Sequence, residues 1–160
     1  MSHAHSPILE TRSLVWSDEA GCAACAQALA AHPAARRATI ELHGTLGAGK
    51  TTFVRHLLHA LGVEGRIKSP TYAVMEPYEL PDLAAWHFDF YRFNDPQEWE
   101  DAGLRDVFAG PGLKLVEWPE KAAELLPPCD LRLEIAPRET GDARNARFEA
   151  LTARGRELMS

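Results

Sequence analysis

The fold of this chain is decided by the stretch Gly44-Thr45-Leu46-Gly47-Ala48-Gly49-Lys50-Thr51. It matches the pattern G-x-x-x-x-G-K-[ST] at all of its defined positions. Because so short a pattern also occurs by chance, the segments on either side matter. The alternating segment 37–43 predicts a strand that ends at the loop, and the amphipathic segment 50–61 predicts a helix that begins in it. This order of strand, glycine loop and helix predicts a P-loop; the alternative is a glycine-rich connection that binds nothing.

Each residue type in this loop has a physical reason. The glycines let the backbone turn tightly and bring its N–H groups against phosphate oxygens. The amino-terminal end of the helix adds a partial positive charge. We expect Lys50 to reach the β- and γ-phosphates, the Thr51 hydroxyl to coordinate Mg²⁺, and Thr52 to bond an α-phosphate oxygen. The residues predicted to hold the nucleotide are Gly44, Thr45, Leu46, Gly47, Ala48, Gly49, Lys50, Thr51 and Thr52.

Two acidic residues stand at the ends of apolar segments, where a carboxylate could hold the metal or orient water. Asp89 ends the run 85–88, and Glu117 ends the run 115–116. In α/β sheets the carboxyl ends of the strands face the ligand crevice, so both positions suit catalysis together with Lys50. The alternative is that each is a solvated residue at a strand edge.

The run Lys68-Ser69-Pro70-Thr71-Tyr72 is rich in hydroxyl groups and follows the predicted helix. A loop of this kind can sense the γ-phosphate, as switch loops do, through Ser69 and Thr71. The alternative is an ordinary turn with proline at its second position.

The rest of the chain predicts an α/β fold with a mixed central sheet. The segments 71–78 and 84–90 both predict strands and have no helix between them, so we expect them to pair antiparallel. Further strands are predicted at 13–16, 114–117, 131–135 and 147–151. Further helices are predicted from a Ser17 cap to about His32, from Pro96 onward, and over 119–126. The expected fold class is that of P-loop NTPases, with a parallel core, added antiparallel strands and flanking helices.

Length and composition limit the other possibilities. With 160 residues the chain is expected to form one domain over 1–160, with a loose segment at 1–10. No apolar run reaches the roughly 18 residues of a membrane span, no secretory signal is apparent, and three cysteines favour a reducing cytoplasm. The net charge of −6 disfavours a chain that binds RNA or DNA by itself, so a partner is expected to hold any nucleic acid.

Four segments in this order resemble one family. They are the loop 44–52, the run 68–72, His87-Phe88-Asp89-Phe90-Tyr91-Arg92, and Leu115-Val116-Glu117-Trp118-Pro119. Together they are similar to the bacterial TsaE (YjeE) family, which serves tRNA threonylcarbamoyladenosine biosynthesis, and the resemblance covers roughly residues 10–155.

The resemblance implies a cytoplasmic Mg²⁺-dependent ATPase with a mixed sheet. It implies two partner proteins, TsaD and TsaB, which modify the adenosine next to the anticodon. The chain would then contact tRNA only indirectly, through its complex with these partners. It also implies a first switch at 69–72, a second at 89–92, a magnesium contact from Glu117 and a nucleotide contact from Trp118. ATP rather than GTP follows from this resemblance, since no N-K-x-D motif is present. Members of the family usually have an acidic residue where this chain has Thr45. The resemblance therefore implies no role for such an acid in turnover or partner contact here.

Two other functions remain open from the sequence. One is a small-molecule P-loop kinase, although no lid insertion rich in arginine is visible. The other is a docking protein that binds nucleotide without hydrolysing it. The pair Cys22 and Cys25, and the pair His56 and His59, are expected to be ordinary helix residues rather than redox or metal sites.

Overall fold

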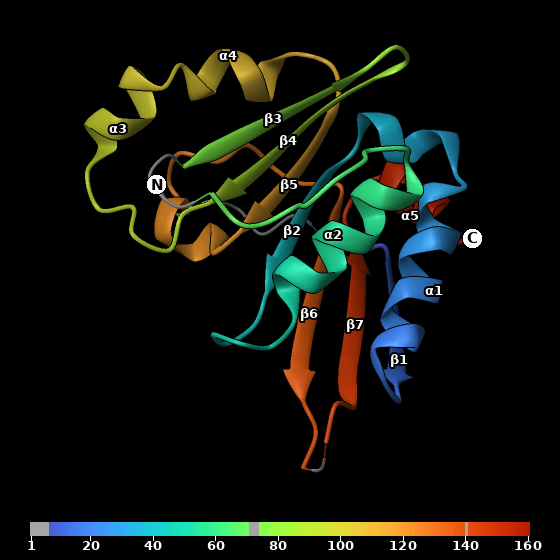
Figure 1. Ribbon diagram of the computed structural model, residues 1–160. Helices are drawn as coiled ribbons and strands as arrows, with labels where there is room; N and C mark the ends of the chain where they lie inside the picture. Colours follow the sequence, from blue (N-terminus) through green and yellow to red (C-terminus); the bar gives the residue numbers. More distant parts are fainter. Residues whose placement is uncertain (1–6, 71–73, 140) are drawn as a thin grey trace.

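The computed structural model describes residues 7–70, 74–139 and 141–160, and its main feature is one seven-stranded sheet (Figure 1). The strands lie in the order β1-β7-β6-β2-β5-β4-β3. Their bounds are β1 Glu10–Trp16, β2 Thr39–His43, β3 Met75–Leu80, β4 Leu83–Asp89, β5 Leu113–Glu117, β6 Leu131–Pro137 and β7 Arg144–Ala150. The helices are α1 Glu19–Ala30, α2 Lys50–Ala60, α3 Pro96–Asp101, α4 Leu104–Ala109 and α5 Ala153–Leu158, with short 3₁₀ helices η1 Pro33–Arg37 and η2 Pro119–Ala122.

The centre of the sheet is parallel and its edges are antiparallel. Strand β2 pairs in parallel with both β5 and β6, and β4 pairs in parallel with β5. Strands β3, β7 and β1 join antiparallel to β4, β6 and β7. The predicted mixed sheet and the predicted antiparallel pairing of its two consecutive strands are therefore confirmed.

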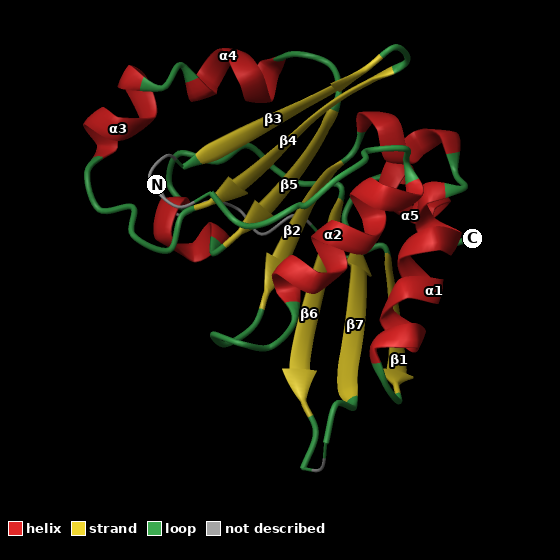
Figure 2. Ribbon diagram, in the orientation of Figure 1, coloured by secondary structure: helices red, strands yellow, loops and turns green. Residues whose placement is uncertain are grey.

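Helices cover both faces of this sheet (Figure 2). On one face α1 and α2 pack over β-strand residues such as Leu42 and Leu115 in a large apolar cluster. On the other face α3 and α4 pack over β4 and β5, where Phe88 and Val116 join a second, aromatic cluster. Successive strand residues point to opposite faces, so one strand supplies both clusters. The carboxyl ends of β2, β4 and β5 remain together at one edge, which positions the site described below.

Several element boundaries differ from the sequence-based expectation. The first helix was predicted to run to about His32; α1 ends at Ala30, and the 3₁₀ helix η1 that follows shortens the predicted strand 37–43 to Thr39–His43. The side chain that caps α1 is Asp18 rather than Ser17, because its carboxylate accepts from the Gly21 N–H. The predicted helix 119–126 was wrong in type and length, since η2 spans only 119–122. Helices α4 and α5 were not predicted, because six residues show little periodicity and, unlike α3, neither begins with a proline.

A buried aspartate ties the start of β2 to the end of the chain. Asp130 accepts hydrogen bonds from the Thr39 N–H at 2.8 Å and from the Thr152 hydroxyl at 2.7 Å. Thr152 in turn caps α5, where Gly155 lies so close to the Asp130 carbonyl that no side chain would fit. Asp130 thus fixes the strand that leads into the glycine loop.

We expect Asp130→Ala to lower the free energy of unfolding by about 2 kcal/mol, because it leaves a buried backbone N–H and a hydroxyl without partners. Urea unfolding at neutral pH measures the change. Asp82→Ala is the matched control, since Asp82 is exposed and makes only a surface ion pair with Arg36. Equal losses in the two variants would contradict a specific role for Asp130.

Candidate functional site

The glycine loop joins β2 to α2, as the sequence predicted. The strand ends at His43 and the helix begins at Lys50. Gly47 and Gly49 have φ angles of 80° and 113°, which residues with a Cβ rarely adopt, and nothing lies within 4 Å of a Cβ added at either. The first N–H groups of α2 have no partner within the helix. The loop therefore offers an open concave backbone at a helix amino terminus, an arrangement suited to an anion.

Gly44 is required for a different reason, because an added Cβ would lie 2.5 Å from the Ile135 carbonyl oxygen of β6. Its φ of 152° is also outside the usual range of residues with a side chain. The loop can leave the sheet at this point only because the residue is glycine.

Lys50 lies across the loop and is 4% exposed. Its Nζ donates to the Gly44 carbonyl at 2.6 Å and lies 3.4 Å from the centre of the Trp118 ring. Burial lowers the pKa of Lys50, and the carboxylates of Glu117, Glu120 and Asp89 oppose that shift. A buried ammonium group with one carbonyl and an aromatic face as neighbours is well placed to pair with phosphate oxygens.

Trp118 covers this lysine through an unusual backbone conformation. It is the one residue other than glycine with positive φ in the described parts of the chain, at φ 56° and ψ 47°. Such a conformation costs about 1–3 kcal/mol for a bulky residue, and it is typical of functional sites. It turns the ring back over Lys50, where it also packs 4.9 Å from the ring of Tyr91.

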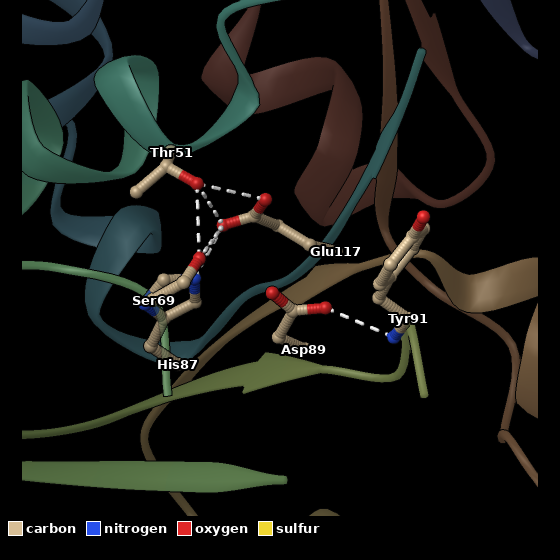
Figure 3. A network of polar contacts seen from close by, with 6 residues as sticks. All are labelled: Thr51, Ser69, His87, Asp89, Tyr91 and Glu117. Carbon is tan, nitrogen blue, oxygen red and sulfur yellow. Dashed lines mark hydrogen bonds and ion pairs between the residues drawn. The ribbon is translucent and has the colours of Figure 1, made fainter. Parts of the chain in front are cut away.

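Glu117 lies at the centre of a polar network (Figure 3). The Thr51 Oγ1 lies 3.0 and 2.9 Å from its two carboxylate oxygens, and the Ser69 Oγ lies 3.0 Å from Thr51 and 3.3 Å from Glu117. Glu117 itself is 3% exposed. The structure thus brings together three of the predicted site residues, from α2, β5 and the loop before β3.

His87 completes this network, although it was not among the predicted site residues. Its Nε2 lies 2.6 Å from Glu117 Oε2, and its side chain is fully buried. An ionised carboxylate only accepts, so the Nε2 carries the hydrogen and donates it. The signal that could have found it is strand alternation, because residues 87 and 89 of one strand point to the same face.

Asp89 does not take part in the Glu117 network, although the two residues are neighbours in register. Its Oδ1 accepts from the Tyr91 N–H at 2.9 Å, and Figure 3 shows it beside the network. The two predicted carboxylates are therefore adjacent but differently bound. Glu117 has contacts to hydroxyl groups that suit a metal site, whereas Asp89 holds the turn that follows β4.

The donor set fits a magnesium ion held jointly with phosphates. Thr51 and Glu117 supply oxygen atoms close together, and no group of three or more His, Cys, Asp or Glu side chains able to hold a metal occurs in the described residues. Mg²⁺ commonly takes one or two protein ligands and completes its shell with phosphate oxygens and water. The site therefore suits a phosphate-bound Mg²⁺ better than a metal held by protein alone.

The other predicted nucleotide contacts lie at the edges of the loop. The Thr45 carbonyl accepts from the Ala48 N–H, and Leu46 at the loop tip is 71% exposed. The Thr52 hydroxyl accepts from Arg55 at 3.2 Å. Thr71 lies outside the described residues.

The cysteines and histidines of α1 and α2 behave as expected for ordinary helix residues. Burial raises the pKa of the Cys22 thiol to about 12 and also raises that of Cys25, so neither is a reactive thiolate at neutral pH. His56 lies 2.9 Å from Glu19, and His59 lies 2.8 Å from the Gly65 carbonyl. In the described residues, no helix is long and apolar enough to cross a membrane.

Comparison with known proteins places this geometry in one family. A sequence model described as "Threonylcarbamoyl adenosine biosynthesis protein TsaE" matches residues 16–146. The tRNA threonylcarbamoyladenosine biosynthesis protein TsaE of Haemophilus influenzae is 41% identical over 121 residues, which are 76% of this chain and 75% of that protein. The protein of that name from Bacillus subtilis is 41% identical over 103 residues, 64% of this chain and 63% of its own length.

A solved structure shows the same architecture. The crystal structure of YdiB from Bacillus subtilis superposes with a TM-score of 0.72 at 30% identity, over 96% of this chain and 95% of that one. The family match spans the glycine loop, Glu117 and Trp118. The chain belongs to the TsaE family.

Proposed function

We propose that this chain is a Mg²⁺-dependent P-loop ATPase of tRNA N6-threonylcarbamoyladenosine modification. The observation that carries the proposal is the convergence of Lys50 on the glycine loop with the Thr51–Glu117 pair at the carboxyl end of β5. A positive phosphate cradle next to a hydroxyl and a carboxylate is what Mg·ATP binding requires. In this proposal, residues 1–160 form one domain with the P-loop NTPase fold.

In this proposal, some residues bind the phosphates and others bind the metal. Loop N–H groups and Lys50 bind the β- and γ-phosphates, while Thr51 and Glu117 would hold Mg²⁺, which would neutralise the charge that develops during phosphoryl transfer. Ser69, bonded to both Thr51 and Glu117, lies where it can respond to the γ-phosphate. Asp89, the register partner of Glu117 on the neighbouring strand β4, orients the turn that carries Tyr91 against Trp118. Trp118 limits the freedom of the Lys50 side chain and contacts the bound nucleotide.

The partners in this proposal are the proteins TsaD and TsaB. Membership of the TsaE family supports the pathway, and the net charge of −6 supports a division in which those proteins bind the tRNA. The chain then acts in the cytoplasm as the component that hydrolyses ATP, and it meets tRNA only through the complex.

The test is phosphate release from Mg·ATP by the purified chain, alone and with TsaD and TsaB. We expect slow release alone, a changed rate with both partners, and no release when EDTA removes the metal. Labelled phosphate transferred to a metabolite would indicate a kinase instead. Tight ATP binding with no turnover in any mixture would indicate a docking protein, and absence of nucleotide binding would refute the proposal.

A further inference from the structure

The two edge strands of the sheet differ in how well they are protected against further pairing. Strand β3, at one edge, contains Pro77, which has no backbone N–H, and exposes the like charges of Glu76 and Glu79. Strand β1, at the other edge, contains no proline, and its residues 11–15 are all exposed (Figure 2). In the described parts of the chain β1 pairs only with β7. The outer side of β1 is therefore able to pair with another strand.

Exposed apolar side chains gather along this edge. Among the described residues seven large hydrophobic side chains are exposed, and four of them lie on β1 or directly before it, namely Ile8, Leu9, Leu14 and Val15, at 39–54% exposure. The Leu9 N–H donates to the Ala150 carbonyl at 2.8 Å, so the extended chain stays bonded ahead of β1. Apolar residues concentrated on an unprotected edge strand indicate a contact surface.

The charges on β1 complement a second copy of the same strand. Glu10 and Arg12 lie two residues apart, so their side chains share one face, where they form an exposed ion pair at 3.4 Å. In an antiparallel pair with its two-fold axis at Thr11, Glu10 of each copy lies directly opposite Arg12 of the other. The same register sets Ile8 opposite Leu14. An axis two residues further along the strand would instead oppose Arg12 to Leu14, so charge selects the register at Thr11.

The helix next to this edge leaves room for a second copy. Helix α1 packs closely on the end of β1, since a Cβ added at Gly21 would lie 3.3 Å from Trp16. The exposed alanines of α1 are Ala20, Ala24 and Ala28, spaced four residues apart on one face. Side chains as short as these allow another chain to approach closely.

We propose that two copies of this chain associate through antiparallel pairing of their β1 strands, which joins two seven-stranded sheets into one. The contact is isologous, because the same residues of each copy meet across the two-fold axis. Strands β7 and β6 separate β1 from β2, so the pairing uses no residue of the glycine loop or of the Glu117 network. The inference goes beyond the proposed function and is independent of it, because the pairing requires neither nucleotide nor metal.

The experiment is sedimentation velocity of the full chain without nucleotide, at about 100 μM, since a small interface associates weakly. The wild type is expected to sediment as a dimer. Glu10→Arg and Arg12→Glu each set like charges opposite one another at two places, and each is expected to weaken dimerisation about 10-fold. An equimolar mixture of the two variants brings opposite charges together again. We therefore expect mixed dimers with the affinity of the wild type, detected by a fluorescent label on one variant.

Glu79→Arg is the matched control, because it makes the same charge reversal at an exposed position of the other edge strand, β3, and should leave dimerisation unchanged. Equal weakening in Glu79→Arg, or dimerisation like that of the wild type in both β1 variants, would show that β1 is not the interface. A mixture that remains monomeric would overturn the pairing about Thr11. A monomeric wild type would overturn the inference as a whole and leave the edge to an extended segment of another protein.

Discussion

Lys50→Ala is expected to lower ATP hydrolysis by about 1000-fold, because it removes the only side-chain cation on the loop that we assign to the β- and γ-phosphates. The stability of the folded protein should not decrease. Lys50 is buried with one carbonyl partner, and burial already lowers its pKa, so removal relieves the cost of a desolvated charge. Phosphate release and thermal unfolding of the same preparation measure the two effects.

Two further variants test whether the effect is specific to the Lys50 side chain. Lys121→Ala removes an exposed lysine whose backbone N–H donates to the Trp118 carbonyl, and it should keep hydrolysis within about twofold. Lys50→Arg keeps the charge but places a wide, planar group where the space is shared with Gly44 and Trp118, so we expect it not to rescue activity. Full activity in Lys50→Ala would refute the assignment of the loop as the catalytic phosphate site.

Glu117→Gln is expected to lower Mg²⁺-dependent hydrolysis by roughly 100-fold to 1000-fold. The amide is the same size as the carboxylate and can still bond to Thr51 and His87, so the fold should persist. It lacks the negative charge that attracts the metal at the carboxyl end of β5. ATP binding should therefore become nearly insensitive to Mg²⁺, which titration with and without EDTA measures.

His87→Gln tests the same metal site and is expected to have a smaller effect than Glu117→Gln. Because His87 is fully buried and donates to Glu117, its loss should weaken Mg²⁺ binding by about 10–100-fold, the usual effect of removing a group that orients a metal ligand. Glu120→Gln is the matched control, since it removes an exposed carboxylate three residues away. A similar loss in Glu120→Gln would mean that net charge, rather than the Glu117 geometry, governs the metal.

The parts of the site that could be predicted are those that depend on short stretches of chain. The loop between β2 and α2 follows from glycines at positions of positive φ and from a strand and a helix encoded within a few residues. Asp89 and Glu117 were predicted because apolar runs end at them, and both do end their strands. Short elements such as α4 and α5 were missed, since six residues carry too little periodicity.

The sequence by itself determined the glycine loop between a strand and a helix, the mixed α/β class, the acidic strand ends and, through four ordered motifs, the family. Only the tertiary structure decided that His87 and Ser69 meet Glu117 while Asp89 turns toward Tyr91. It alone brought the start of α1 and the β6–β7 hairpin together around a cavity at Thr52. The physical reason is the sequence separation of the interacting residues. Backbone conformation and helix capping depend on neighbours in the chain. Strand order and contacts between distant side chains depend on how apolar surfaces far apart in the sequence are buried against one another.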